Sequence, residues 1–198
     1  VIGLGQIGSY LLNELNNKKK DILNKTGKKI NIVAVSAKNK NKKRSFKINK
    51  KIFYSNPLEI IKKKKIDILF EAIGLSDGIS KKIVEIAIKN KIHVITPNKA
   101  LISKHGDYLS KLAEKNKVNL EFEASVGGGI PILRTIKEGL ATNKISKVYG
   151  ILNGTSNYIL SEMETTKNSF EDVLKKAQSL GYAEPGNPKL DLNGYDAL

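Results

Sequence analysis

The chain opens with VIGLGQIG, residues 1–8, in which two apolar residues lead into three closely spaced glycines. The glycines match the pattern G-x-G-x-x-G, which binds a dinucleotide when it joins a strand to a helix. In that setting Gly3 permits a tight turn, Gly5 lets the backbone approach a pyrophosphate, and Gly8 lets the helix pack closely on the strand. An ordinary glycine turn is the alternative interpretation.

The residues after this turn have the spacing of an amphipathic helix. Its apolar positions are Ile7, Leu11, Leu12 and Leu15. The amides at the start of such a helix, together with the helix dipole, bind phosphate groups. Gln6 and Ile7 therefore join the three glycines as candidate cofactor-binding residues.

Strand and helix patterns alternate over most of the chain. Strands are expected at 30–35, 67–73, 93–96 and 118–125, and helices at 79–87 and 108–117. This alternation predicts the α/β class, with a Rossmann-type parallel sheet and helices on both faces.

A run of glycines at 127–129 interrupts this alternation. We therefore expect a domain boundary there. Residues 1–129 form the predicted nucleotide-binding domain, and residues 130–198 form the start of a second domain.

In the second domain, Pro131 suits the first turn of a helix, residues 147–152 are expected to form a strand, and Asn153-Gly154 a turn. Ser169 is expected to cap a further helix, which Gly181 ends. That helix would bury Phe170, Val173, Leu174, Ala177 and Leu180.

The chain has 198 residues, no cysteine and a formal net charge of +16. It can form no disulfide or thiolate site, and no apolar run approaches the roughly 20 residues of a membrane span. The charge indicates either nucleic-acid binding or a lysine-rich surface. We favour the surface, because the clusters 18–20 and 62–65 have no interleaved aromatic residues to stack on bases. Lys18 to Lys20 are expected to end the first helix.

The end of the second predicted strand, Ser36-Ala37-Lys38, has no acidic residue to bind a ribose 2′-hydroxyl. Cations follow it instead, including Lys38 and Arg44. Because cations pair with a 2′-phosphate, we predict a preference for NADP over NAD. A solvated basic loop is the alternative.

Four motifs extend this interpretation. They are TPNKA (96–100), FEASVGGGIP (122–131), GILNGTSNYIL (150–160) and GYAE (181–184). In this order and spacing, and with the glycine pattern, they resemble the homoserine dehydrogenase family over nearly the whole chain. The resemblance implies a cytoplasmic enzyme of threonine and methionine biosynthesis. Such an enzyme interconverts L-homoserine and L-aspartate 4-semialdehyde with NAD(P), and is a homodimer when full length, with an α+β substrate domain.

The resemblance also implies roles for single residues. Lys99 would lie near the cofactor and the substrate, where it can hold a carboxylate or polarise a carbonyl oxygen. Gly181 would lie near the nicotinamide, and Glu184 would bind the substrate ammonium group. Asp191 and Asp196 match two further acidic positions, with Asp191 binding the substrate and Asp196 assigned to catalysis.

A monovalent-cation loop, with sodium as the expected ion, is implied at Glu123, Val126, Gly128 and Ile130. In the family, backbone carbonyls hold this ion, as suits a hard cation. The alternative is that these glycines only permit tight packing.

The sequence also departs from the family. Asn187-Pro188 stands where Asp-Pro is usual, and 185–187 holds one extra residue. The lysine proposed as proton donor follows the second aspartate by four positions, beyond Leu198. We therefore expect a chain that is truncated at both ends and inactive as it stands.

Three other functions remain as alternatives. The first is a basic nucleic-acid-binding protein, and the second is another Rossmann-type oxo-acid dehydrogenase. The third is a regulatory relative without activity.

Overall fold

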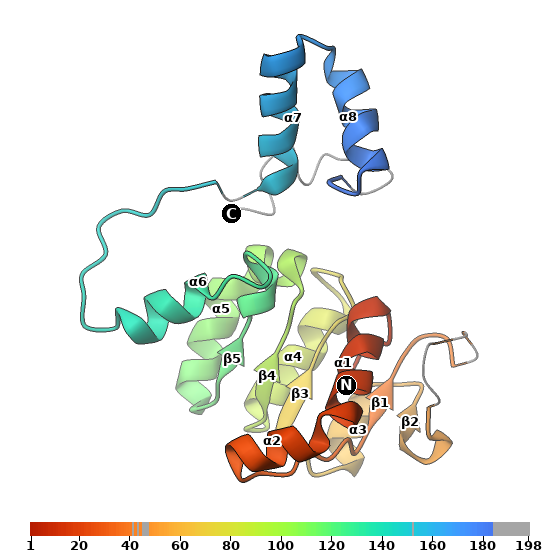
Figure 1. Ribbon diagram of the computed structural model, residues 1–198. Coiled ribbons are helices and arrows are strands. Elements are labelled where there is room, and N and C mark those ends of the chain that lie inside the picture. The colour runs from red at the N-terminus through yellow and green to blue at the C-terminus, as the bar shows by residue number, and fades with distance from the viewer. Residues whose placement is uncertain (41, 43, 45–47, 152, 184–198) are drawn as a thin grey trace. The chain divides into compact units, whose positions relative to one another are not determined.

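The computed structural model describes residues 1–198 except 41, 43, 45–47, 152 and 184–198 (Figure 1). The chain divides into two compact units, Val1–Ser125 and Val126–Leu198, and each unit is described by itself. Among the described residues, no helix combines the length and the apolar character that crossing a membrane requires.

The first unit is built on parallel strands. They are β1 (Val35–Ser36), β2 (Phe53–Tyr54), β3 (Ile68–Phe70), β4 (His93–Ile95) and β5 (Leu120–Glu121). β1 pairs with β2, and β4 lies between β3 and β5. Ile2 forms parallel bridges to both Ser36 and Glu71, so the start of the chain joins the two groups of strands.

Helices cover both faces of these strands (Figure 1). They are α1 (Gln6–Asn17), α2 (Lys19–Thr26), α3 (Leu58–Lys63), α4 (Ile79–Lys89) and α5 (Lys99–Asn116), with 3-10 turns η1 (Lys50–Ile52) and η2 (Glu123–Ser125). Successive strand residues point to opposite faces, and the core follows this rule. Ala34 packs in the cluster with α3, α4 and α5, whereas Val35 packs with Leu12 of α1. The predicted α/β class with a Rossmann-type sheet is confirmed.

Several boundaries differ from the predictions. Residues 30–34 lie outside β1, although they were expected in its strand. The segment before β3, for which no helix or strand was predicted, contains η1, β2 and α3. Lys18 is the C-cap of α1, whereas Lys19 and Lys20 open α2 instead of ending α1. Strand pairing depends on neighbours that periodicity does not reveal, which explains the short β1.

In the second unit, α6 (Ile132–Arg134) continues into a π-helical turn, η3 (Thr135–Gly139), directly after Pro131 as expected. α7 (Gly154–Thr166) and α8 (Phe170–Ser179) then pack together. Their shared core consists of Ile159, Val173, Ala177 and Ala183.

Three expectations for this unit are wrong and one is confirmed. Residues 147–151 form no strand, and residue 152 lies outside the described residues. Asn153 is the N-cap of α7, not part of a turn, because its side chain accepts from the Ser156 amide at 2.6 Å. The predicted cap of α8 is present, since Ser169 Oγ accepts from the Asp172 amide at 3.2 Å and donates to its carboxylate at 2.7 Å. Leu180 follows α8 and is exposed, contrary to expectation.

Candidate nucleotide-binding site and the residues around it

The glycine turn between Ile2 and α1 is closely packed at two positions and open at the third. Gly3 has φ +88°, and a Cβ there would lie 2.2 Å from the Ala72 carbonyl oxygen. A Cβ on Gly8 would lie 2.0 Å from the Gly3 carbonyl oxygen. A Cβ on Gly5 would meet nothing within 4 Å, and Gly5 is exposed. Gly3 and Gly8 therefore permit packing, and Gly5 leaves space in front of the helix.

That space lies at the N-terminus of α1. Gly5 is the N-cap residue, and no side chain in the described part of the chain caps this helix. Gln6 and Ile7 form its first turn and are exposed. The first amides of a helix have no partner within it, so this turn offers donors and a positive dipole end to an anion.

The basic segment after β1 is tied to this turn through Arg44. The Arg44 guanidinium donates to the carbonyl oxygens of Asn39 at 2.6 Å, Lys42 at 2.9 Å and Lys40 at 3.3 Å. Its Nε donates to the Leu4 carbonyl oxygen at 3.3 Å, inside the glycine turn. Arg44 therefore fixes backbone beside the turn.

Lys38 follows β1 and is exposed. The Gly3 amide donates to the Ser36 carbonyl oxygen at 2.9 Å, so the segment that carries Lys38 adjoins the glycine turn. Cofactor binding by Lys38 and Arg44 stays a prediction.

Lys99 is the first residue of α5, at the carboxyl end of β4, and it is exposed. Asn98 caps this helix, because its Oδ1 accepts from the Leu101 amide at 3.1 Å. The helix was expected only over 108–117 but begins at Lys99. Lys99 therefore stands at a helix start on the same edge of the parallel strands as the glycine turn.

A buried carboxylate lies behind Lys99. Glu71 has no exposed surface, and its Oε2 accepts from Thr96 Oγ1 at 2.7 Å. Its Oε1 accepts from the Ile73 amide at 2.8 Å, and Asn98 Nδ2 lies 3.3 Å from both oxygens. Sequence reasoning missed this residue. The one available signal was a glutamate inside the apolar run at 67–73.

The loop between β3 and α4 is also tethered to α5. Asp77 accepts from Lys104 Nζ at 2.7 Å and from Ser76 Oγ at 2.7 Å, and its Oδ1 lies 2.9 Å from His105 Nε2. The Lys104 ammonium, the Ser76 hydroxyl and the His105 ring together hold the pKa of the Asp77 carboxyl well below its usual range. Asp77 is therefore ionised at neutral pH and restrains this loop.

In the second unit, two of the family-like motifs meet. Thr155 Oγ1, on α7, donates to the Tyr182 carbonyl oxygen at 2.5 Å. The rings of Tyr158 and Tyr182 stack with centroids 4.6 Å apart. Gly181 has φ +79°, which lets the chain turn directly after α8. The predicted Glu184, Asp191 and Asp196 lie outside the described residues.

The residues predicted for the cation loop fall in both units. Glu123 lies in η2, and Val126, Gly128 and Ile130 follow at the start of the second unit. Gly127 and Gly129 have positive φ, so the backbone here is irregular enough to point carbonyls in different directions. The Ile130 carbonyl oxygen accepts from the Ile132 amide at 2.8 Å. The cation loop stays a prediction.

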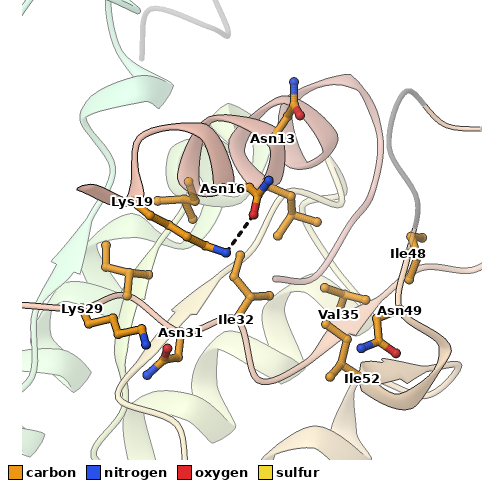
Figure 2. A pocket seen from close by; sticks show the side chains of 13 residues that line it. Asn13, Asn16, Lys19, Lys29, Asn31, Ile32, Val35, Ile48, Asn49 and Ile52 are labelled. Atoms are coloured by element: carbon orange, nitrogen blue, oxygen red, sulfur yellow. Dashed lines mark hydrogen bonds between the residues drawn. The ribbon is translucent and has the colours of Figure 1, made fainter. Parts of the chain in front are cut away.

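A pocket of about 740 Å³ lies elsewhere in the first unit, under the second half of α1 (Figure 2). Its walls come from α1, residues 29–35 and residues 48–52, and Lys19 Nζ donates to Asn16 Oδ1 at 2.8 Å on its rim. None of the predicted site residues lines it. We therefore separate it from the nucleotide site.

A parallel sheet with helices on both faces, and an open glycine turn leading into a helix, define a dinucleotide-binding domain. Residues 3–123 match the family model "Homoserine dehydrogenase, NAD binding domain", and residues 131–198 match the model "Homoserine dehydrogenase". The chain belongs to the homoserine dehydrogenase family. This membership leaves the alternatives, another dehydrogenase or a nucleic-acid-binding protein, without support.

Comparison with individual relatives supports this family assignment. The chain is 41% identical over 197 residues to homoserine dehydrogenase of Neisseria gonorrhoeae and 38% identical over 197 residues to that of Bacillus subtilis. Both alignments cover 100% of the chain and 45% of the relative, so the chain spans about half their length. The crystal structure of a Thiobacillus denitrificans homoserine dehydrogenase is similar with a TM-score of 0.83 and 37% identity, over 99% of this chain and 45% of that one.

A further solved structure shows the same fold at lower identity. It is a hyperthermophilic archaeal homoserine dehydrogenase in complex with NADPH, with a TM-score of 0.80 and 24% identity, over 99% of this chain and 64% of that one.

Proposed function

We propose that this chain forms the cofactor-binding part of a homoserine dehydrogenase, which interconverts L-homoserine and L-aspartate 4-semialdehyde with NAD(P). The main support for this proposal is the exposed Gly5, which leaves space in front of the N-terminus of α1 in a chain of this family. The pyrophosphate would accept hydrogen bonds from the first amides of α1. The nicotinamide, when bound, supplies or accepts the hydride, and the protein aligns it with the substrate.

The proposal includes a preference for NADP. The strand β1 leads into Ser36-Ala37-Lys38 and has no carboxylate at its end. Lys38 would pair with the 2′-phosphate through its flexible ammonium group. Arg44, whose donors engage four backbone carbonyls, would support the same phosphate mainly by shaping the segment that carries Lys38.

Lys99 would hold the substrate carboxylate or polarise the reacting carbonyl oxygen, because it stands at the strand edge where the nicotinamide would lie. Gly181 would border the nicotinamide. Glu184 and Asp191 would bind the amino acid, and Asp196 would act in catalysis. These roles rest on the family motifs.

Three further parts of the proposal concern the whole enzyme. A monovalent cation, expected to be sodium, would be held by the backbone carbonyls of Glu123, Val126, Gly128 and Ile130. The enzyme would act as a homodimer in the cytoplasm, where the amino-acid biosynthesis that it serves takes place.

The first test is nucleotide binding by the chain itself. NADPH and NADH are titrated separately and followed by nucleotide fluorescence, with single-stranded DNA as competitor. We expect tighter binding of NADPH that DNA does not displace. Lys38→Ala should weaken NADPH binding by roughly tenfold, in line with the loss of one charge-assisted hydrogen bond, and leave NADH unchanged. Lys89→Ala, on the exposed end of α4, is the matched control.

Equal binding of the two nucleotides would contradict the NADP preference, and binding of neither by a folded chain would contradict the cofactor site. The second test is homoserine oxidation by a protein that extends this chain to the length of its relatives, in sodium-containing and sodium-free buffer. Absence of homoserine-dependent NADPH formation would refute the proposed activity.

A further inference from the structure

Glu71 is a carboxylate without exposed surface at the carboxyl end of β3. Removing a carboxylate from water is unfavourable unless hydrogen bonds replace its hydration. An apolar residue at this position would not carry the free-energy cost of burying a charge. The nearby buried residues Leu69 and Val94 are apolar. Stability alone is therefore a poor explanation for Glu71.

The groups around Glu71 are all hydrogen-bond donors. They are the Thr96 hydroxyl, the Ile73 amide and the Asn98 side-chain amide, at 2.7 to 3.3 Å. An ionised carboxylate only accepts, so it matches this set completely. A neutral amide at the same position would present a donor to at least one of these groups.

These contacts fix the orientation of Asn98. Its Nδ2 faces Glu71 and also donates to the Leu75 carbonyl oxygen at 2.9 Å, which leaves Oδ1 to cap α5 at the Leu101 amide. The Asn98 backbone amide donates to Thr96 Oγ1 at 3.0 Å. One carboxylate thus joins the loop after β3, the end of β4 and the start of α5.

The same segment adjoins the glycine turn. The Ala72 amide donates to the Ile2 carbonyl oxygen at 2.7 Å, and the Ala72 carbonyl oxygen is the atom that a Cβ on Gly3 would overlap. Lys99 directly follows Asn98. Glu71 therefore lies in a set of hydrogen bonds that links the segment beside the glycine turn to Asn98, the residue before Lys99.

We propose that Glu71 is a positioning residue, which acts through Asn98 to hold Lys99 at a fixed place relative to the glycine turn. The part that concerns Lys99 in the reaction rests on the proposed function. The fixing of the helix start is a property of the chain itself and can be tested without any substrate.

The first experiment measures amide hydrogen exchange in the chain. Asn98→Asp keeps an oxygen that can cap α5, because aspartate is as good an N-cap as asparagine, but it places a second carboxylate against Glu71. We expect exchange at Leu101 to accelerate roughly 10- to 100-fold, the factor for losing a hydrogen bond to a charged group. Glu71→Gln should accelerate exchange at both Ile73 and Leu101.

The double variant, Glu71→Gln with Asn98→Asp, should regain part of the protection, because the new amide can donate to the new carboxylate. Exchange at Leu109, in the middle of α5, reports on the whole fold and should stay unchanged in all variants. Glu85→Gln, which makes the same chemical change on the surface of α4, is the control. Wild-type exchange at Leu101 in Asn98→Asp, equal acceleration at Leu109, or additive effects in the double variant would each overturn the proposal.

The second experiment uses the extended protein and its homoserine oxidation. Glu71→Gln should lower kcat by about tenfold and change the KM for the oxidised nucleotide, NADP, by less than about threefold, because the substitution displaces Lys99 without removing a cofactor contact. In a Lys99→Met background the same substitution should have no further effect on kcat. An undiminished effect there would overturn the role through Lys99. If the extended protein does not oxidise homoserine at all, the proposed function fails, and amide exchange still decides the positioning role of Glu71.

Discussion

Alanine substitutions at Gly5 and Gly8 should separate nucleotide binding from stability. Gly5→Ala adds a methyl group that meets nothing within 4 Å, and Gly5 has φ −74°, which any residue adopts. The free energy of unfolding should change by less than about 1 kcal/mol, the usual difference between glycine and alanine near an N-cap. The methyl group occupies the space through which a pyrophosphate would approach the amides of α1.

The expected loss of binding follows from those amides. If the phosphate can no longer reach one of them, a charge-assisted hydrogen bond of about 1.5–3 kcal/mol is lost, which is a roughly 10- to 100-fold weaker NADPH affinity. Gly8→Ala should instead lower the stability of the fold. Its Cβ would lie 2.0 Å from the Gly3 carbonyl oxygen, so the backbone must shift, and we expect destabilisation of about 3 kcal/mol.

The assay combines urea denaturation and thermal melting with fluorescence titration of NADPH on the same samples. A destabilisation of this size corresponds to a melting temperature lower by roughly 6–12 °C for Gly8→Ala, whereas Gly5→Ala should melt close to wild type. The reasoning is refuted if Gly5→Ala binds NADPH as tightly as wild type, or if it loses as much stability as Gly8→Ala.

Three further predictions concern stability. Ser169→Ala should destabilise the α7–α8 pair by about 1 kcal/mol because α8 loses its N-cap, and circular dichroism during urea denaturation would show this; an unchanged midpoint would contradict it. Leu109→Ala should cost about 2–5 kcal/mol, since this side chain on α5 is fully buried in the core, and retention of the wild-type melting temperature would argue against the described core. Asp77→Asn should lower stability at neutral pH: the depressed pKa of Asp77 means that its ionised form stabilises the fold above the unfolded pKa of about 4, and that this contribution is lost as pH falls further. The difference in urea midpoint between wild type and Asp77→Asn should therefore shrink as the pH falls below about 4, and a difference that grows over that range would have the wrong sign.

The elements that were predicted correctly are determined by residues that lie close together in the sequence. The glycine turn and α1 follow from three glycines and an apolar stripe, and the cap of α8 follows from Ser169 three residues before Asp172. The start of α7 was misassigned because asparagine before glycine favours both turns and helix N-caps, and only tertiary packing selects between them.

The missed features depend on contacts between distant segments. Residues 30–34 have strand propensity, but β1 forms only where Ile2 and β2 provide partners. Glu71 and Thr96 are 25 residues apart, so their hydrogen bond is invisible to periodicity. The glycines, Lys38 and Lys99 could be proposed for the candidate site from residue type and position alone, and their roles stay predictions. Glu71 could not be proposed in this way, because its role depends on its burial.

The contacts of Arg44 have a consequence for how cofactor choice can change during evolution or by design. Its guanidinium engages backbone carbonyls from Leu4 to Lys42, so it specifies backbone shape independently of neighbouring side-chain identity. Lys38, in contrast, is exposed and can be exchanged without disturbing that backbone. If Lys38 pairs with the 2′-phosphate as proposed, nucleotide selectivity is separable from the local fold: a single surface substitution at Lys38 would change it, while Arg44 would preserve the backbone on which any such variant depends.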